Sequence, residues 1–189
     1  KVAIRQLELS DSEASIKVSP TPSAPVATAT SPSTEPGWTF RLGQMSLQNN
    51  HLRYDDTSAP ALRTGLDLGH LLVTRLNADI QDLYYTEEAV GGRVAQLSFL
   101  EKSGLGIRQF RADFGQTPSE TYLRGLHAAS TQSLLRGDLT LRHRSLQALT
   151  RDLPSVGVSL ALTESKVSFQ EILRLFPSLA KTPPFVSYP

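Results

Sequence analysis

Few side chains of this sequence have the types and spacing that catalysis or metal binding requires. The histidines stand singly, with no His-x-x-x-His pair and no carboxylate at ligand spacing, so we expect no metal site. Adjacent carboxylates could do acid-base chemistry, but at turns they are usually solvated surface groups. The residues concerned are His51, His70, His127 and His143, and the pairs Asp55-Asp56 and Glu87-Glu88.

Serine and glycine patterns likewise give no reason to expect an enzyme. Ser103, Ser133 and Ser165 each follow a predicted strand, yet none lies in a Gly-x-Ser-x-Gly nucleophile elbow. Gly91-Gly92 and Gly104-Leu105-Gly106 lack the strand, loop and helix context of a phosphate-binding loop. The sequence has no cysteine, which excludes a disulfide, a thiolate zinc site and a cysteine nucleophile. We expect no catalytic residue, no metal ligand and no cofactor.

The charge balance does not favour nucleic acid as a partner. The 189 residues include 19 Lys or Arg and 18 Asp or Glu, a formal net charge of +1. Single arginines on the polar phase of the predicted strands could contact anionic head groups. A solvated surface needs such residues too, and we favour that interpretation. They are Arg108, Arg111, Arg124 and Arg136, together with the run Arg142-His143-Arg144.

Apolar and polar residues alternate along most of the chain from Trp38 onward, which predicts half-buried β-strands. The longer strands are predicted over residues 66–85, 93–99, 106–114, 121–128 and 134–142. Turns are expected at Asp55-Asp56, Gly91-Gly92, Gly104 and Gly115. The fold class is therefore predicted to be mainly β, a curved antiparallel sheet that forms a groove.

Two segments depart from this alternation and predict short helices, near residues 143–153 and 168–181. In the second segment, Ser168 and Glu171 form a capping-box pattern at the expected start. We expect the apolar positions of this helix to pack on the sheet as a lid or an edge cover. They are Phe169, Ile172, Leu173 and Phe176.

The chain is predicted to divide into three regions. Residues 19–37 are rich in Pro, Ser and Thr, and we expect a disordered loop there because so little apolar surface cannot offset the entropy of ordering. Residues 1–18 are expected to add N-terminal strands to the same sheet. Residues 38–189 are expected to form a β-groove domain, and the whole chain is expected to be a fragment of a larger protein.

An internal repeat organises the expected sheet. Residues 7–16, 45–54 and 160–169 share one spacing of two apolar positions, a small polar residue and two further apolar positions. We interpret each copy as a strand, a tight polar kink and a second strand whose apolar side chains return to the same face. The kinks are predicted at Asp11-Ser12, Asn49-Asn50 and Glu164-Ser165, with looser copies around Ser103 and Ser133.

The apolar stripes of these units are the remaining candidate for a functional surface. Most of their residues are expected to form hydrophobic core. Part of the stripe is instead predicted to line an open groove for acyl chains or unfolded β-strands, because two short helices cannot cover a long sheet. The candidate groove residues are Leu47, Leu52, Tyr54, Leu97, Phe99, Leu160 and Leu162.

Five segments in a fixed order carry a family resemblance. They are GWTFRL at residues 37–42, MSLQNNHLRYD at 45–55, GLDLGHL at 65–71, LSFLEKSGL at 97–105 and LTESKVSFQEILRLFPSL at 162–179. Together they resemble the TamB-type translocation and assembly module family, AsmA-like periplasmic proteins with a repeating β-groove. The resemblance covers nearly the whole chain.

The resemblance implies the periplasmic part of an inner-membrane-anchored protein of a Gram-negative envelope. It implies a non-enzymatic bridge that assists outer-membrane biogenesis and protein secretion, with lipid or β-strand cargo in an apolar groove. The implied partners are the remainder of the parent chain, an outer-membrane assembly factor and phospholipid. The sequence has no run of roughly 18 apolar residues, so the anchor is expected outside it. The alternative is an envelope-associated β-solenoid or sandwich that binds a protein or a glycan.

Overall fold

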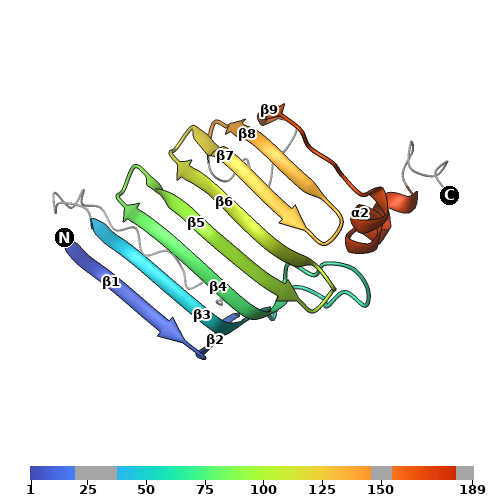
Figure 1. Ribbon diagram of the computed structural model, residues 1–189, viewed down its shortest axis with the longest axis horizontal. Helices are drawn as coiled ribbons and strands as arrows, with labels where there is room; N and C mark the ends of the chain where they lie inside the picture. The colour runs from blue at the N-terminus through green and yellow to red at the C-terminus, as the bar shows by residue number, and fades with distance from the viewer. Residues whose placement is uncertain (20–37, 146–154, 182–189) are drawn as a thin grey trace, which may run out of the picture.

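Nine strands form one curved, unclosed sheet with a short helix at its rim (Figure 1). The computed structural model describes residues 1–19, 38–145 and 155–181. The architecture confirms the predicted mainly β fold. The strands are β1 (Val2–Ser10), β2 (Glu13–Val18), β3 (Phe40–Asp56), β4 (His70–Tyr85), β5 (Val90–Glu101), β6 (Gly106–Gln116), β7 (Glu120–Ser130), β8 (Leu134–Arg142) and β9 (Gly157–Leu162).

The strands lie in chain order, with one exception at the first edge. From β3 to β9 each strand pairs antiparallel with the next. β1 and β2 both pair with the same edge of β3, one after the other, and both run parallel to it. The predicted antiparallel sheet therefore has two parallel pairings at one edge.

Kinks lie where the repeat predicts them: inside β3 at Asn49, between β1 and β2 at Asp11, and just after β9 at Glu164. Asp11, Asn49 and Glu164 have φ angles of 50°, 51° and 42°, in the left-handed region that few residues other than glycine adopt. The small polar residue of each repeat copy follows directly. Its polar atoms then bind the neighbouring backbone, as when Ser165 Oγ accepts from the Arg136 amide at 2.9 Å.

The kinks allow a long strand to change direction and keep its apolar residues on one side. Leu47 and Asn50 are three residues apart and would face opposite sides of a regular strand. They lie opposite Ala78 and Leu76, which alternate normally and share a side. Leu47 and Asn50 therefore share that side as well. Three more kinks of this kind, in β4 and β7, are at Arg75, Asp82 and Gly125.

At the first edge, β1 pairs with β3 in the register that aligns equivalent positions of the sequence repeat. Leu7 lies opposite Met45 and Leu9 opposite Leu47, so the first two repeat copies lie side by side, parallel and kink beside kink. The buried Asn50 side chain joins the two kinks. It accepts from the Ser12 amide and donates to the Leu9 carbonyl, both at 2.9 Å.

The two looser copies of the repeat lie at hairpin turns, not at kinks within a strand. Around Ser103 the chain turns between β5 and β6, with Gly104 at φ 90° and its amide donating to the Glu101 carbonyl at 2.9 Å. Around Ser133 it turns between β7 and β8, with the Ser130 amide donating to the Ser133 carbonyl at 2.9 Å. The turn predicted at Gly104 is thereby confirmed.

The turns predicted at Gly91-Gly92 and Gly115 are wrong, because these glycines lie inside β5 and β6. They leave room for tyrosine rings on neighbouring strands. A Cβ on Gly115 would lie 2.4 Å from the Tyr122 ring, and one on Gly91 would lie 2.7 Å from the Tyr84 hydroxyl. Glycine in a strand interior here marks close packing of an aromatic side chain.

The C-terminal helix forms where predicted but presents a different side to the sheet. It comprises α2 (Phe169–Leu175) and the 3-10 turn η2 (Pro177–Lys181), and Ser168 is its N-cap. The prediction that Phe169 and Phe176 pack on the sheet is wrong, since their exposed fractions are 53% and 41%, whereas Glu171 and Leu175 are buried. Because polar groups of the β7–β8 hairpin lie next to the helix, a carboxylate suits this contact better than an aromatic ring.

Other predicted segments are only partly described. Residues 143–145 of the predicted helix 143–153 are not helical, and the rest of it lies outside the described residues, as does the predicted loop 19–37 beyond Ser19. No helix of the described chain is long and apolar enough to cross a bilayer.

Replacing Asn50 with alanine tests how the kink holds β1 and β2. The change leaves the partly buried Ser12 amide and Leu9 carbonyl without partners, which should lower the free energy of unfolding by about 1 kcal/mol. Amide exchange in residues 2–18 should accelerate more than in β5 and β6. Gln48→Ala, an exposed change two residues away, is the control and should have little effect. Equal exchange in both variants would show that the amide does not fasten the edge.

Candidate functional site

One side of the sheet, which we call the apolar face, gathers the apolar residues of the strands. Directly opposed residues of neighbouring strands project to the same side, so the register defines rows across the sheet. One such row is apolar on all seven strands that it crosses. It runs Leu9, Leu47, Ala78, Leu97, Phe110, Ala128 and Leu135.

All seven candidate groove residues lie on this face. Leu47 and Leu97 belong to the row itself, and the kink at Asn49 brings Leu52 and Tyr54 to the same side. Phe99 alternates normally with Leu97 in β5 and shares its side.

The two candidates near the far edge reach the same face through β8. Leu160 lies opposite Leu139 and Leu162 opposite Gly137. Both partners alternate normally with Leu135 of the apolar row. The register therefore brings residues that are far apart in the sequence together on one surface.

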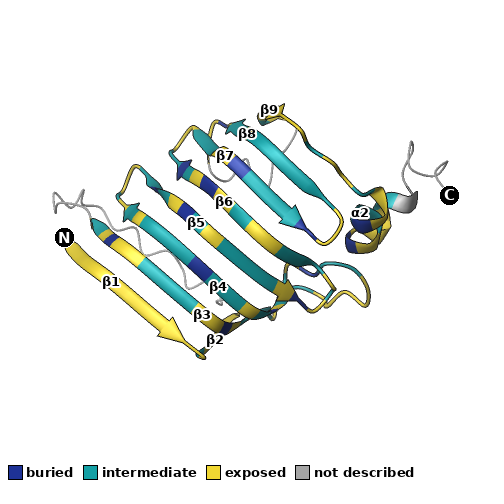
Figure 2. Ribbon diagram, in the orientation of Figure 1, coloured by how far each residue is buried: buried dark blue, intermediate teal, exposed yellow. Residues whose placement is uncertain are grey.

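Burial follows the position across the sheet (Figure 2). In the middle strands, Ala78, Val94, Ala112 and Leu126 of the apolar face are buried, although no second layer of strands exists among the described residues. Toward β9 the face opens, and Leu160 is 55% exposed.

The opposite side, the polar face, is charged but balanced. Arg93 and Asp113 form an ion pair at 2.7 Å, and Arg124 lies over the Tyr122 ring at 4.2 Å from its centre. His127 lies between Arg111 and Arg136. Its burial and then these two cations lower the pKa of His127, which keeps the imidazole uncharged at neutral pH. The two faces therefore differ sharply in their affinity for water.

A polar cluster fastens α2 to the rim of the apolar face. The Glu171 carboxylate accepts from Ser130 Oγ at 2.5 Å and from Ser133 Oγ at 2.6 Å. The Ser168 amide donates to Ser133 Oγ at 3.1 Å, which completes the helix cap from the sheet side. Burial alone would raise the pKa of Glu171, but the two serine hydroxyls and the nearby Arg174 more than offset it and hold the pKa below its ordinary value.

The cluster was missed by the sequence analysis, which took Glu171 as the far half of a capping box. Only the cap itself was visible in the sequence, as Ser168 followed three residues later by Glu171. The Glu171 side chain instead binds Ser130 and Ser133, more than thirty residues earlier, and no local spacing signals such a contact.

Two further buried carboxylates serve the backbone. Glu101, the most buried large side chain of the described residues, accepts from the Ser103 amide at 2.7 Å and from the Leu72 amide at 3.3 Å. Asp67 accepts from the Leu62 amide at 2.8 Å and lies 3.2 Å from His70 Nδ1. Hydrogen bonding by Leu62, helped by His70, lowers the pKa of Asp67 despite its burial. No group of side chains in the described parts of the chain could hold a metal ion.

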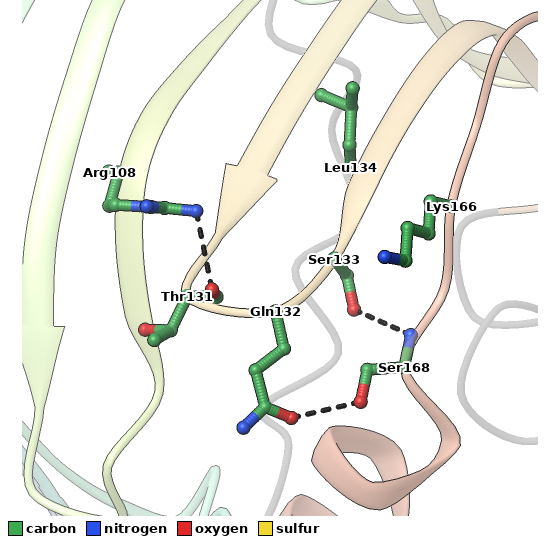
Figure 3. A pocket seen from close by; sticks show the side chains of 7 residues that line it. All are labelled: Arg108, Thr131, Gln132, Ser133, Leu134, Lys166 and Ser168. Atoms are coloured by element: carbon green, nitrogen blue, oxygen red, sulfur yellow. Dashed lines mark hydrogen bonds between the residues drawn. The ribbon is translucent and has the colours of Figure 1, made fainter.

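A pocket of about 590 Å³ lies at the β7–β8 hairpin beside the helix start (Figure 3). Arg108 and Lys166 contribute its positive charge, and Gln132 and Ser168 are joined across it by a 2.9 Å hydrogen bond. The Arg108 guanidinium is already engaged by the Ser130 and Thr131 carbonyls. Leu134 and Lys166 are opposed residues on the polar face, so this pocket is not part of the apolar face.

Comparison with protein-family models, with curated proteins and with solved structures finds no match for this chain.

The Glu171 cluster predicts a pH-dependent helix contact. Because the pKa of Glu171 is lowered in the folded chain, ionisation stabilises the docked helix above the ordinary value of 4.5, and this stabilisation is lost as the pH falls. Methyl NMR signals of Ile172 and Leu173 should shift toward those of an undocked helix on acidification. Glu171→Gln keeps a similar shape without the titrating group, and its signals should stay constant. An identical pH profile in this control would assign the transition to another group.

Proposed function

We propose that this chain is a non-enzymatic segment of a bridge across a bacterial envelope, and that its apolar face carries the acyl chains of phospholipids. The observation on which this rests is a continuous apolar face in an unclosed sheet, with no second sheet over it among the described residues. Apolar surface of this extent is rarely left to water in soluble proteins, and it usually meets a ligand or a partner.

The dimensions fit an acyl chain. Neighbouring strands lie about 4.8 Å apart, so the row from Leu9 to Leu135 crosses seven strands and spans about 30 Å. That is about the thickness of a bilayer's hydrocarbon core, which holds two layers of acyl chains. One acyl chain can therefore lie along the row at full length, between the kinks on either side of it.

The chemistry of the face also fits a lipid better than a catalytic substrate. The polar groups buried along it, those of Asn50, Glu101 and Ser130, bind the protein's own backbone or side chains. They do not present a set of converging donors and acceptors for a polar ligand. An acyl chain requires no such set, because its transfer from water is driven by apolar burial alone.

The resemblance to TamB-type, AsmA-like proteins supports the cellular setting of the proposal. In that setting the chain is the periplasmic part of an inner-membrane-anchored protein of a Gram-negative envelope. Its partners are the remainder of the parent chain and an outer-membrane assembly factor, and the transported material serves outer-membrane assembly.

Photo-crosslinking at two phases of the same strands tests the proposal. A photoreactive side chain at Leu52 or at Phe99, on the apolar face, should give lipid adducts when the protein is purified from Gram-negative cells and examined by mass spectrometry. The same probe at Arg53 or Ser98, which lie opposite Leu72 and Asn77 on the polar face, should give none.

The possible results separate three interpretations. Equal labelling on both faces means non-specific contact with lipid and contradicts the proposal. Crosslinks from Leu52 and Phe99 to unfolded outer-membrane protein would identify β-strand cargo instead of lipid. Crosslinks to a folded protein or a glycan would favour the alternative, an envelope-associated binding module.

A further inference from the structure

Both outer edges of the sheet carry a copy of the kinked repeat. At the first edge it is residues 7–16, in β1 and β2, and at the last edge it is residues 160–169, which begin in β9. Among the described residues, β9 pairs only with β8, and β1 pairs only with β3. Within the described ranges, each edge therefore leaves one row of backbone hydrogen-bonding groups without a strand partner.

The structure already shows how two copies of this repeat pair. Residues 7–16 lie parallel to residues 45–54, in register, with apolar positions opposed and kink beside kink. The left-handed residues of the two kinks are neighbours, and Asn49 Nδ2 donates to Asp11 Oδ1 at 2.7 Å. The two kinked strands pair on both sides of the kink without any shift in register, so kinks at the same level preserve the pairing.

We propose that copies of this chain associate head to tail, with the outer edge of β9 pairing with the outer edge of β1 of the next copy. The pairing is parallel and follows the repeat, so that Leu160 lies opposite Leu7 of the next copy and Leu162 opposite its Leu9. This interaction surface goes beyond the lipid-carrying role proposed above and does not depend on it.

The side chains along the two edges complement each other in this register. The apolar positions at the edges are well exposed in a single copy, with Leu7 at 37%, Leu9 at 43% and Leu162 at 44%. The pairing buries them against one another and continues the apolar face from one copy to the next. Beyond the kink, Lys166 comes opposite Glu13 of the next copy, which is a favourable pair of charges.

One pair of charges in this register is unfavourable. Glu164 comes opposite Asp11 of the next copy, at the kink. Each already has a partner in its own chain, since Glu164 accepts from Arg136 Nη1 at 2.8 Å and Asp11 accepts from Asn49. Arg136 therefore partly neutralises Glu164 before the copies meet, and one oxygen of Asp11 is already hydrogen-bonded.

The helix leaves the edge of β9 accessible. The chain turns away at Ser168, whose side chain binds Gln132 of the β7–β8 hairpin. From there α2 runs along the rim toward the interior of the sheet. Arg174 Nη2 donates to the Gly104 carbonyl at 3.3 Å, and the Leu66 amide donates to the Leu175 carbonyl at 2.7 Å.

Engineered cysteines test the register directly, because the sequence contains no cysteine of its own. Ala161 and Glu8 are both exposed, and the proposal brings them opposite each other in neighbouring copies. Their Cα atoms would lie about 4.8 Å apart, within the range that a disulfide spans. A mixture of Ala161→Cys and Glu8→Cys chains should give a disulfide-linked dimer under mild oxidation, and neither variant should do so alone.

A shifted pair serves as the register control. Ser10→Cys in place of Glu8→Cys moves the thiol two residues along β1, to about 8 Å from the Ala161 position, and should lose most of the cross-link. Dimers formed by either variant alone would indicate a symmetric contact between like edges and overturn the proposal. Equal cross-linking of both pairs would also overturn it.

Sedimentation of the unmodified chain supplies the second measurement. Its sedimentation coefficient should rise with concentration without a plateau at the dimer, because a head-to-tail contact does not close. Val158→Lys places a charge on the edge of β9 and should abolish this rise. Leu68→Lys is the matched control, since Leu68 and Val158 are 64% and 65% exposed and Leu68 lies in a loop. A chain that stays monomeric at every concentration overturns the proposal.

Discussion

The alternation of side chains along a strand is the constraint on which the rest of this structure depends. A sheet that curves over many strands needs long strands that bend, yet a bend that inserts one residue would send every later side chain to the opposite face. At Asp11, Asn49 and Glu164 the inserted residue adopts the left-handed conformation, so the side chains that follow return to the face they had before the bend. A left-handed conformation at a residue other than glycine costs roughly 1–2 kcal/mol. Hydrogen bonds made by Asn49 and Asn50 offset that cost at the first edge.

A single-layer sheet must satisfy its buried polar groups from within. In a sandwich, the facing layer could supply partners, but here the main buried polar side chains bind groups of the same sheet and its turns. Asn50 joins two strands, Glu101 closes the β5–β6 hairpin, and Glu171 fastens the helix. These contacts lie at kinks and rims, which leaves the middle rows of the face free of polar side chains. The same distribution makes the face suitable for an apolar cargo.

The sequence predicted the parts of the fold that depend on local spacing. The repeat located the three kinks because a small polar residue between apolar pairs requires a particular backbone conformation. The spacing of the first two copies also matches the parallel register of β1 with β3, although nothing in the spacing shows that two copies pair directly. Gly91 and Gly115 were misinterpreted because glycine in a turn and glycine beneath a tyrosine ring look alike in a sequence.

At the candidate site, too, features set by local spacing could be predicted and long-range contacts could not. Their phase along each strand could be predicted, and with it their common side of the sheet. The contact of Glu171 with Ser130 and Ser133 could not, because it joins segments about forty residues apart and depends on where the rim of the sheet lies. For the same reason the helix was expected to bury its aromatic residues, which the structure leaves exposed.

Strand contacts in this sheet join immediate neighbours only. The folding energy is therefore close to a sum of terms for single strands and for adjacent pairs, as in a one-dimensional lattice. In such a system an end unit has one neighbour where an inner unit has two, so melting starts at the ends and proceeds inward strand by strand. A chain of this kind opens gradually over a range of temperature, and its middle strands remain ordered after its ends have frayed.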